Sequence, residues 1–408
     1  MKIAIPKEHR SGETRVAASP EVIKKLAGFG FEVVVEKGAG DGASFTDDSL
    51  KEAGAAIAKD MAAALKGADV VLKIQKPIID GAAAKNELAK MKKGTVLIAY
   101  LQAMTSPKDV AAYAKAGVTA FAMELMPRIT RAQSMDILSS QSNLAGYKAV
   151  LDGAAEYGSA FPMMMTAAGT APPARVFIMG VGVAGLQAIA TAKRLGAVVT
   201  ATDVRPDTKE QVESLGGKFL IVDEEMEKDA QTEGGYAKEM PPEYFDKQRQ
   251  VVAEHLKSQD IVITTALIPG RPAPVLIAED LVKTMKPGSV IVDLAVEAGG
   301  NCPLSQLGKV VEKHGVKIVG HENVPGRLAK DASALFAKNL LNFLSPHVDA
   351  ESKSIEFDWE DETVTGTLVT RDGKIVNQRV LEASAAKPAP KAPKKAAPRK
   401  AAAAKKGK

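Results

Sequence analysis

Residues 175–205 hold the feature that most constrains the fold. Gly180, Gly182 and Gly185 follow the G-x-G-x-x-G spacing, and Asp203 comes 18 residues after the last glycine. The apolar run 176–179 predicts a buried strand before the glycines, and residues 186–195 predict a helix after them. Strand, glycine turn, helix, second strand and acid form the full context of a dinucleotide-binding unit, although a glycine-rich turn can also be purely architectural.

Each part of this unit has a physical role. Gly180 permits a tight turn, Gly182 lets backbone N–H groups approach a pyrophosphate, and Gly185 lets the helix pack closely on the strand. The helix N-terminus then faces the phosphates. Asp203 can accept hydrogen bonds from an adenosine ribose and repel a 2′-phosphate, which favours NAD(H) over NADP(H). Arg205 is the opposing signal, because an arginine here can accommodate a 2′-phosphate; the alternative is a solvated surface charge.

The composition predicts a globular protein with two domains. The chain has 408 residues, of which 46% are hydrophobic, 25% charged and only 4% aromatic, and this low aromatic content argues against a base-stacking nucleic-acid surface. Cys302 is the single cysteine, so an internal disulfide is excluded and a reducing compartment is expected. The N-terminal residues lack a signal-peptide pattern, and glycines interrupt the most apolar window, 176–192. We therefore expect a cytoplasmic chain that does not itself span a membrane.

The net charge of +5 arises at one end of the chain. Residues 383–408 contain nine lysines or arginines and no acid, so +5 minus nine leaves −4 for the rest. This Ala/Pro/Lys composition predicts a disordered basic tail, placed at 382–408. Attraction to anionic lipids and a plain solvated linker are both compatible with it.

Apolar runs alternate twice with amphipathic segments, which predicts two α/β domains with doubly wound, Rossmann-like parallel sheets. The first domain is expected to contain strands at 2–6, 32–36, 69–74, 95–100 and 118–124. The second is expected to contain six strands, as suits the dinucleotide-binding form, at 176–179, 198–203, 219–222, 260–265, 289–294 and 317–319. A helix at 141–157 would connect the domains, with the nucleotide cleft between them.

The C-terminal region predicts a discontinuous first domain. A helix at 328–344 and a hairpin turning at Asp372-Gly373 hold too little apolar surface for a core of their own, so they should pack back on the first domain. The predicted domains are 1–140 plus 328–381, and 141–327. The insertion 223–258 is either a lid, with Gly234-Gly235 as hinge and Tyr236 as contact, or a surface loop with a short helix.

A second polar motif follows the last strand of the first domain, at 127–139. Arg128, Gln133, Asp136 and Ser139 offer donors and acceptors that suit a carboxamide and ribose hydroxyls. A well-hydrogen-bonded loop without a ligand would explain the same residues. Because a nucleotide fold does not name a reaction, this motif is the candidate for a second site.

These motifs together resemble a known family. The match covers 12–17, 128–147, the Gly180 fingerprint and 292–297, and it spans almost all of residues 1–380. The chain resembles the soluble NAD(H)-binding component, domain I, of proton-translocating nicotinamide nucleotide transhydrogenase, and more distantly alanine dehydrogenase. The resemblance implies an NAD(P)+ transhydrogenase in which a homodimer of this chain binds NAD(H) and exchanges a hydride with NADP(H) on a partner subunit. Membrane-spanning partners would translocate protons and hold the chain at the inner membrane.

The resemblance also implies the residues of the site. Arg128, Gln133, Asp136 and Ser139 would position the nicotinamide, with Ile129 beside them and Gln133 able to reach the partner's nucleotide. The other implied cofactor contacts are Gly180, Val181, Gly182, Val183 and Gly185 at the pyrophosphate, Asp203, Val204 and Arg205 at the adenosine, and Gly235, Tyr236, Gln248 and Leu267 elsewhere. Tyr236 would be the tip of a mobile loop.

Alanine dehydrogenase is the main alternative. Its reaction needs an acid–base group beside the substrate carbon, because hydride transfer there is coupled to loss of a proton. That family has a histidine in a Tyr-Leu-His context and an aspartate after Val-Asp-Val-Ala, where this chain has Gln102 and Glu297. Glutamine exchanges no proton near neutral pH, so the amino-acid chemistry is disabled. Arg15 and Lys73 or Lys76 persist where the dehydrogenase holds its substrate carboxylate, and structural pairing would also explain them.

Hydride transfer between two nicotinamide rings needs no general acid or base, because neither ring gains or loses a proton. Catalysis would then consist of holding the rings together and excluding water. The five histidines show no metal-ligand spacing, and no metal is expected. A third possibility is a non-catalytic protein that binds NADH and responds to it.

Overall fold

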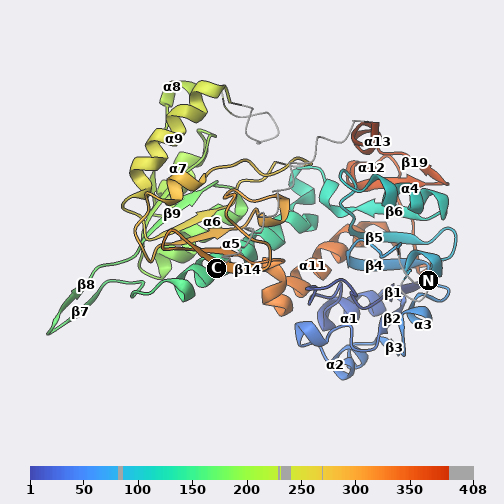
Figure 1. Ribbon diagram of the computed structural model, residues 1–408. Coiled ribbons are helices and arrows are strands. Elements are labelled where there is room, and N and C mark those ends of the chain that lie inside the picture. The colour runs from blue at the N-terminus through green and yellow to red at the C-terminus, as the bar shows by residue number, and fades with distance from the viewer. Residues whose placement is uncertain (81–85, 228–229, 231–239, 269, 386–408) are drawn as a thin grey trace, which may run out of the picture.

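The computed structural model describes residues 1–80, 86–227, 230, 240–268 and 270–385. Two α/β domains lie side by side, and helix α5 (Ile137–Glu156) runs from one into the other (Figure 1). Within the described ranges, no helix is both long enough and apolar enough to cross a membrane.

The first sheet has eight strands and includes the C-terminal return of the chain. Six parallel strands follow the order β3-β2-β1-β4-β5-β6. They are β1 (Lys2–Ile5), β2 (Glu32–Glu36), β3 (Ala56–Ala58), β4 (Val70–Gln75), β5 (Val96–Tyr100) and β6 (Thr119–Ala122). Beyond β6 the sheet continues antiparallel with β18 (Leu368–Arg371) and β19 (Lys374–Ile375), whose turn is Asp372-Gly373. The expected discontinuous first domain is therefore confirmed.

Helices cover both faces of this sheet, as a doubly wound fold requires. Along β1, Ile3 and Ile5 enter one core and Ala4 enters the opposite core, because side chains alternate along a strand. Helices α1 (Pro20–Gly28) and α11 (Ala329–Leu344) pack on the first face. The other face carries α3 (Met61–Leu65), α4 (Pro107–Lys115) and α13 (Gln378–Ala385).

The second sheet repeats this order, with its first strand at the glycine turn. Its parallel strands follow the order β11-β10-β9-β12-β13-β15, which is the 3-2-1-4-5-6 order of dinucleotide-binding folds. They are β9 (Arg175–Met179), β10 (Val198–Thr202), β11 (Lys218–Phe219), β12 (Ile261–Thr264), β13 (Val290–Asp293) and β15 (Val316–Gly320). Helices α5, α6 (Val183–Arg194) and α7 (Thr208–Ser214) cover one face, and α9 (Pro242–Leu256) and α10 (Glu279–Val282) cover the other.

The structure adds short elements that the sequence pattern did not predict. These are β3, the antiparallel edge strand β14 (Lys309–Lys313), and a hairpin of β7 (Met164–Thr166) and β8 (Gly169–Ala171). All are short or lie at an edge, where exposed side chains give no alternating apolar pattern.

Three predicted segments also differ from the structure. Helix α5 begins four residues early because Asp136 caps it. The insertion contains a helix of 15 residues, α9, which is longer than the short helix considered, while Gly235 and Tyr236 lie outside the described residues. Helix α13 extends to Ala385, into the first residues of the expected tail, and the rest of that tail also lies outside the described residues.

Two glycines let α5 serve both domains. Ile137 at its start belongs to the first core, whereas Ala149 and Val150 belong to the second. A Cβ on Gly146 would lie 2.0 Å from the carbonyl oxygen of Ala184, so the backbones of α5 and α6 touch there. A Cβ on Gly153 would lie 3.1 Å from Ile261. The domain boundary placed at 140/141 falls within this helix, and it stays a prediction.

We expect Gly146→Ala to destabilise the protein although alanine is the better helix former. The new methyl group must push α5 and α6 apart, which should lower the free energy of unfolding by about 1–3 kcal/mol. Gly158→Ala is the matched control, because nothing lies within 4 Å of a Cβ there. Denaturant unfolding of both variants measures this, and equal stabilities would contradict the contact.

Candidate functional site

The three glycines of the turn are required for three different reasons. Gly180 has φ of 100°, a left-handed conformation, and a Cβ there would lie 2.5 Å from Thr265 Oγ1. A Cβ on Gly185 would lie 2.0 Å from the carbonyl oxygen of Gly180. Gly182 has an ordinary φ of −82° and open space around its missing Cβ. No protein contact among the described residues therefore demands glycine at 182, which fits the role of admitting a ligand.

The first turn of α6 is suited to an anion. Gly182 is the N-cap, so no side chain caps the helix, and the first turn contains no acidic residue. Val183, the first helical residue, is exposed. Uncapped N–H groups and the positive end of the helix dipole together favour a phosphate at this position.

Asp203 is tied both to the glycine turn and to Arg205. Its Oδ2 accepts a hydrogen bond from the Val181 N–H at 2.7 Å, so the acid directly supports the turn. The Arg205 backbone N–H and Nε donate to Oδ1, each at 2.9 Å, and Nη2 donates to Oδ2 at 2.8 Å. Arg205 is thus neither of the two things expected of it, because its guanidinium forms an ion pair with Asp203. Val204 between them packs beside Tyr244 in a small separate core.

The motif at 127–139 forms an exposed loop and the beginning of α5. Residues 130–135 make the 3-10 helix η5 (Thr130–Met135), which buries Ala132 and Met135. Arg128 and Gln133 are exposed, and Ile129 is half-buried at the N-cap of η5. Gln133 is therefore in reach of a group outside this chain.

Asp136 and Ser139 have a structural task in the same motif. Asp136 Oδ1 accepts hydrogen bonds from the Leu138 N–H at 2.8 Å and the Ser139 N–H at 3.1 Å. Ser139 Oγ donates to the other carboxylate oxygen at 2.5 Å. The two residues cap α5, so any cofactor contact that they make is added to this role.

The remaining predicted contacts lie at the edge of the second domain. Leu267 follows β12 and is 57% exposed, while Gln248 on α9 is half-buried in a surface groove with Phe245 and Val275. The loop after β12 is clamped by Asn301, a fully buried residue that sequence reasoning missed. Its amide donates to the carbonyls of Ala266 and Pro274 at 2.9 and 2.8 Å and accepts from the Ala266 N–H at 3.1 Å.

Loops at the carboxyl ends of both sheets meet between the domains. Asn323, in the left-handed conformation after β15, donates to the Gly12 carbonyl at 3.0 Å, and Thr14 Oγ1 donates to the Gly326 carbonyl at 2.5 Å. On the other side of this junction, a Cβ on Gly270 would lie 4.0 Å from Met104. The two carboxyl edges, where α/β sheets bind ligands, therefore face each other.

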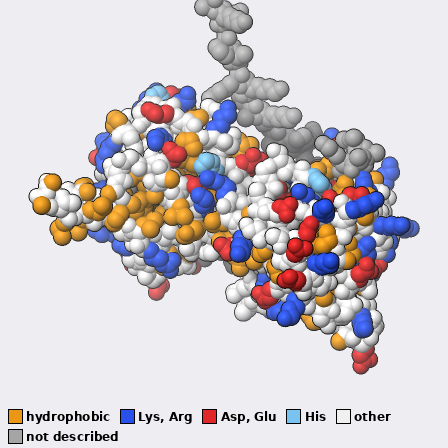
Figure 2. All heavy atoms as spheres, turned by 90° about the horizontal axis from the view of Figure 1, so that it is seen from below, with side chains coloured by type: hydrophobic (Ala, Val, Ile, Leu, Met, Phe, Trp, Pro, Cys, Tyr) orange, Lys and Arg blue, Asp and Glu red, His pale blue; other side chains and the backbone are white. Residues whose placement is uncertain are grey.

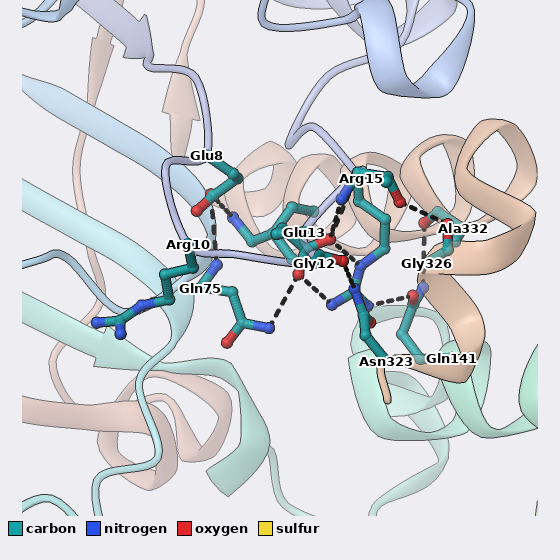
Figure 3. A network of polar contacts seen from close by, with 12 residues as sticks. Glu8, Arg10, Gly12, Glu13, Arg15, Gln75, Gln141, Asn323, Gly326 and Ala332 are labelled. Carbon is teal, nitrogen blue, oxygen red and sulfur yellow. Dashed lines mark hydrogen bonds and ion pairs between the residues drawn. The ribbon is translucent and has the colours of Figure 1, made fainter. Parts of the chain in front are cut away.

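The residues shared with alanine dehydrogenase are engaged with each other (Figure 3). Arg15 donates to both oxygens of Glu13 at 2.8 Å, and its Nη1 donates to Gln141 at 2.8 Å. Although burial opposes the shift, Arg15 lowers the pKa of Glu13 to about 2. Lys73 is fully buried between Glu8 and Glu87, and Lys76 pairs with Asp109 at 2.7 Å. Structural pairing thus accounts for all three cations.

Gln102 occupies a strained position. Its φ is 53°, which is uncommon for a residue with a side chain. Glu124 supports this conformation, because its oxygens accept hydrogen bonds from the Leu101 N–H at 3.0 Å and the Ala103 N–H at 2.8 Å. Burial raises the pKa of Glu124, and the backbone N–H groups oppose the shift. Sequence reasoning missed Glu124, whose only signal was an acid at the end of a predicted strand.

The site therefore consists of two groups joined by one helix. Hydrogen bonding unites the glycine turn with Asp203, while the Gln133 loop leads directly into α5, which touches the first turn of α6 at Gly146. Gly235 and Tyr236 cannot be assigned to either group, because they lie outside the described residues.

Comparison with known proteins agrees with this arrangement. The alanine dehydrogenase/PNT N-terminal domain matches residues 4–145, and the C-terminal domain of the same family matches residues 149–378. In Rhodospirillum rubrum, the first of the separate chains that form NAD(P) transhydrogenase subunit alpha is 68% identical over 377 residues, covering 92% of this chain and 98% of that protein. The crystal structure of transhydrogenase from Sinorhizobium meliloti superposes with a TM-score of 0.80 at 50% identity, covering 93% of this chain and 99% of the other.

Alanine dehydrogenases are more distant. The enzyme of Halomonas elongata is 30% identical over 392 residues, covering 94% of this chain and 96% of that protein. The larger identity to the transhydrogenase subunits agrees with the glutamine at position 102. The chain therefore belongs to the alanine dehydrogenase/PNT family, within its group of NAD(P) transhydrogenase alpha subunits.

Proposed function

We propose that this chain binds NAD(H) at the junction of its two domains and exchanges a hydride with NADP(H) held by a separate subunit. The observation that carries the proposal is the combination of an uncapped glycine turn with an exposed Gln133. The first feature suits a pyrophosphate, and the second presents an amide to a partner. Membrane-spanning partners would couple the transfer to proton movement and keep this chain at the cytoplasmic face of the membrane.

The residues of the second domain fit a dinucleotide. Open space at Gly182 and the uncapped start of α6 suit the pyrophosphate, with Val181 and Val183 on either side. The Asp203–Arg205 pair follows β10, where the adenosine ribose is expected. A 2′-phosphate would meet an arginine already engaged by a carboxylate, so this pair favours NAD(H) over NADP(H).

The chemistry that we propose is positional. Bound nicotinamide supplies the hydride, and this chain would hold the ring, present Gln133 toward the partner and exclude water. Gln102 stands where an amino-acid dehydrogenase would need a proton-exchanging side chain, and Arg15 is neutralised by Glu13. Both features support transfer between nucleotides over oxidation of alanine.

A homodimer is supported by the projecting hairpin β7–β8. Met163, Met164 and Met165 are 57%, 46% and 76% exposed, and Figure 2 shows apolar side chains gathered on this arm and the adjoining face. An isolated two-stranded hairpin is marginally stable in water. A second copy of the chain that covers these methionines would stabilise it.

Reconstitution with an NADP-binding partner subunit tests the proposed reaction. NADH should reduce an NADP analogue only when both proteins are present, and alanine should give no NAD reduction. We expect Gln133→Asn to slow the transfer by about tenfold or more while leaving the dissociation constant for NADH nearly unchanged, since the amide acts by position. Alanine-dependent NAD reduction without nucleotide transfer would contradict the proposal, as would NADH binding with no transfer to any acceptor.

We expect Gly182→Ala to separate binding from folding. The protein has room for the methyl group, so the free energy of unfolding should change by less than about 0.5 kcal/mol. The same methyl group would stand between the backbone and a pyrophosphate, so NADH affinity should fall by about tenfold or more. Fluorescence titration with NADH and denaturant unfolding check the two expectations. Unchanged affinity would mean that the phosphates bind elsewhere.

A further inference from the structure

The C-terminal return of the chain holds the backbone next to Gln133. The carbonyl oxygen of Ser134 accepts hydrogen bonds from Asn339 Nδ2 at 2.8 Å and from Asn342 Nδ2 at 2.9 Å. Both amides project from α11, about 200 residues away in the sequence, at the i and i+3 spacing that places side chains on one face of a helix. Two donors on one carbonyl fix the peptide plane directly after Gln133.

Asn339 joins this contact to α5. Its Oδ1 accepts a hydrogen bond from Ser140 Oγ at 2.7 Å, and its side chain lies almost entirely out of solvent. Loop, α5 and α11 are therefore one hydrogen-bonded unit. Asn342 is only half-buried, and its amide donates to the Ser134 carbonyl.

Arg131 secures the loop on the other side of Gln133. Its two terminal nitrogens donate to the two carboxylate oxygens of Asp361 at 2.8 and 2.9 Å. Asp361 also caps α12 (Glu362–Thr367) by accepting from the Thr363 N–H at 2.7 Å. A bidentate pair of this kind fixes orientation as well as distance. The loop is thus held two residues before Gln133 and one residue after it, in both cases by the return segment.

We propose that Asn339 and Asn342 are positioning residues for hydride transfer, which hold the Ser134 peptide and thereby aim the Gln133 side chain. The inference rests on the proposed function of Gln133. It gives the return segment a role in the reaction beyond completing the first sheet. A small tilt of this peptide moves the Gln133 amide, and displacements of about 1 Å can reduce a rate by up to about a hundredfold.

Asn342→Asp tests the proposal with little change in size. Near neutral pH the new carboxylate cannot donate, and it places a negative charge beside the Ser134 carbonyl. In the full chain with an NADP-binding partner, we expect kcat for NADH-dependent reduction of an NADP analogue to fall by about tenfold, with the NADH dissociation constant unchanged within about twofold. Lys338→Gln on the same helix is the matched control, because Lys338 pairs with Glu21 instead, and it should leave both quantities unchanged.

A double-mutant cycle distinguishes positioning from general damage. If Asn342 acts through Gln133, Asn342→Asp should lower kcat in the wild-type background but by less than about twofold in the Gln133→Ala background. Equal losses in both backgrounds, or no loss in either, would overturn the inference. Asn342→Ser, which removes the amide without adding charge, serves the same comparison if the aspartate variant does not fold. Absence of transfer in the wild type, or full rate in Gln133→Ala, would instead refute the proposed function.

Discussion

The contact between α5 and α6 at Gly146 is the constraint on which the rest of the structure depends. It brings the backbone of α5 against Ala184, the second residue of α6, and so against the turn that suits a pyrophosphate. The same helix begins at Asp136, directly after the loop that carries Gln133. Because a helix is a stiff spacer, α5 fixes the distance between the phosphate end and the nicotinamide end of the proposed site. Gly153, against Ile261 in β12, holds the other half of the helix to the second sheet.

Buried acids around this helix hold loops in place. Asp293 is almost fully buried and accepts hydrogen bonds from the N–H groups of Ala295, Asn301 and Cys302 at 3.0 to 3.1 Å. Glu124 does the same for the backbone on both sides of Gln102. A carboxylate whose oxygens already accept backbone hydrogen bonds is poorly placed to exchange protons with a substrate. This use of acids agrees with a reaction that consists of bringing two rings together.

The regions of the fold that could be predicted from the sequence are those whose signal is local. The glycine turn, the long buried strands and the hairpin at Asp372-Gly373 each carry their pattern within a few residues, and the structure contains them all. The edge strand β14 was missed because Lys309, Glu312 and Lys313 leave few apolar positions to alternate. Asn301, Asn339 and Asn342 act through backbone groups that are distant in sequence, and no local pattern reveals such a partner. The same reason explains the misjudged side chains: a sequence does not show that Arg205 folds back onto Asp203, or that Asp136 and Ser139 cap α5.

Direct passage of the hydride between two nicotinamide rings, without a proton-exchanging group of the protein, is the central claim about this chain. NADH carrying deuterium at both C4 positions, mixed in ordinary water with this chain, an NADP-binding partner and NADP+, tests this claim most directly. Mass spectrometry of the product should find one deuterium in each NADPH formed. NADPH that carries hydrogen from the solvent would contradict the claim, because the transferred atom would then have exchanged on the way.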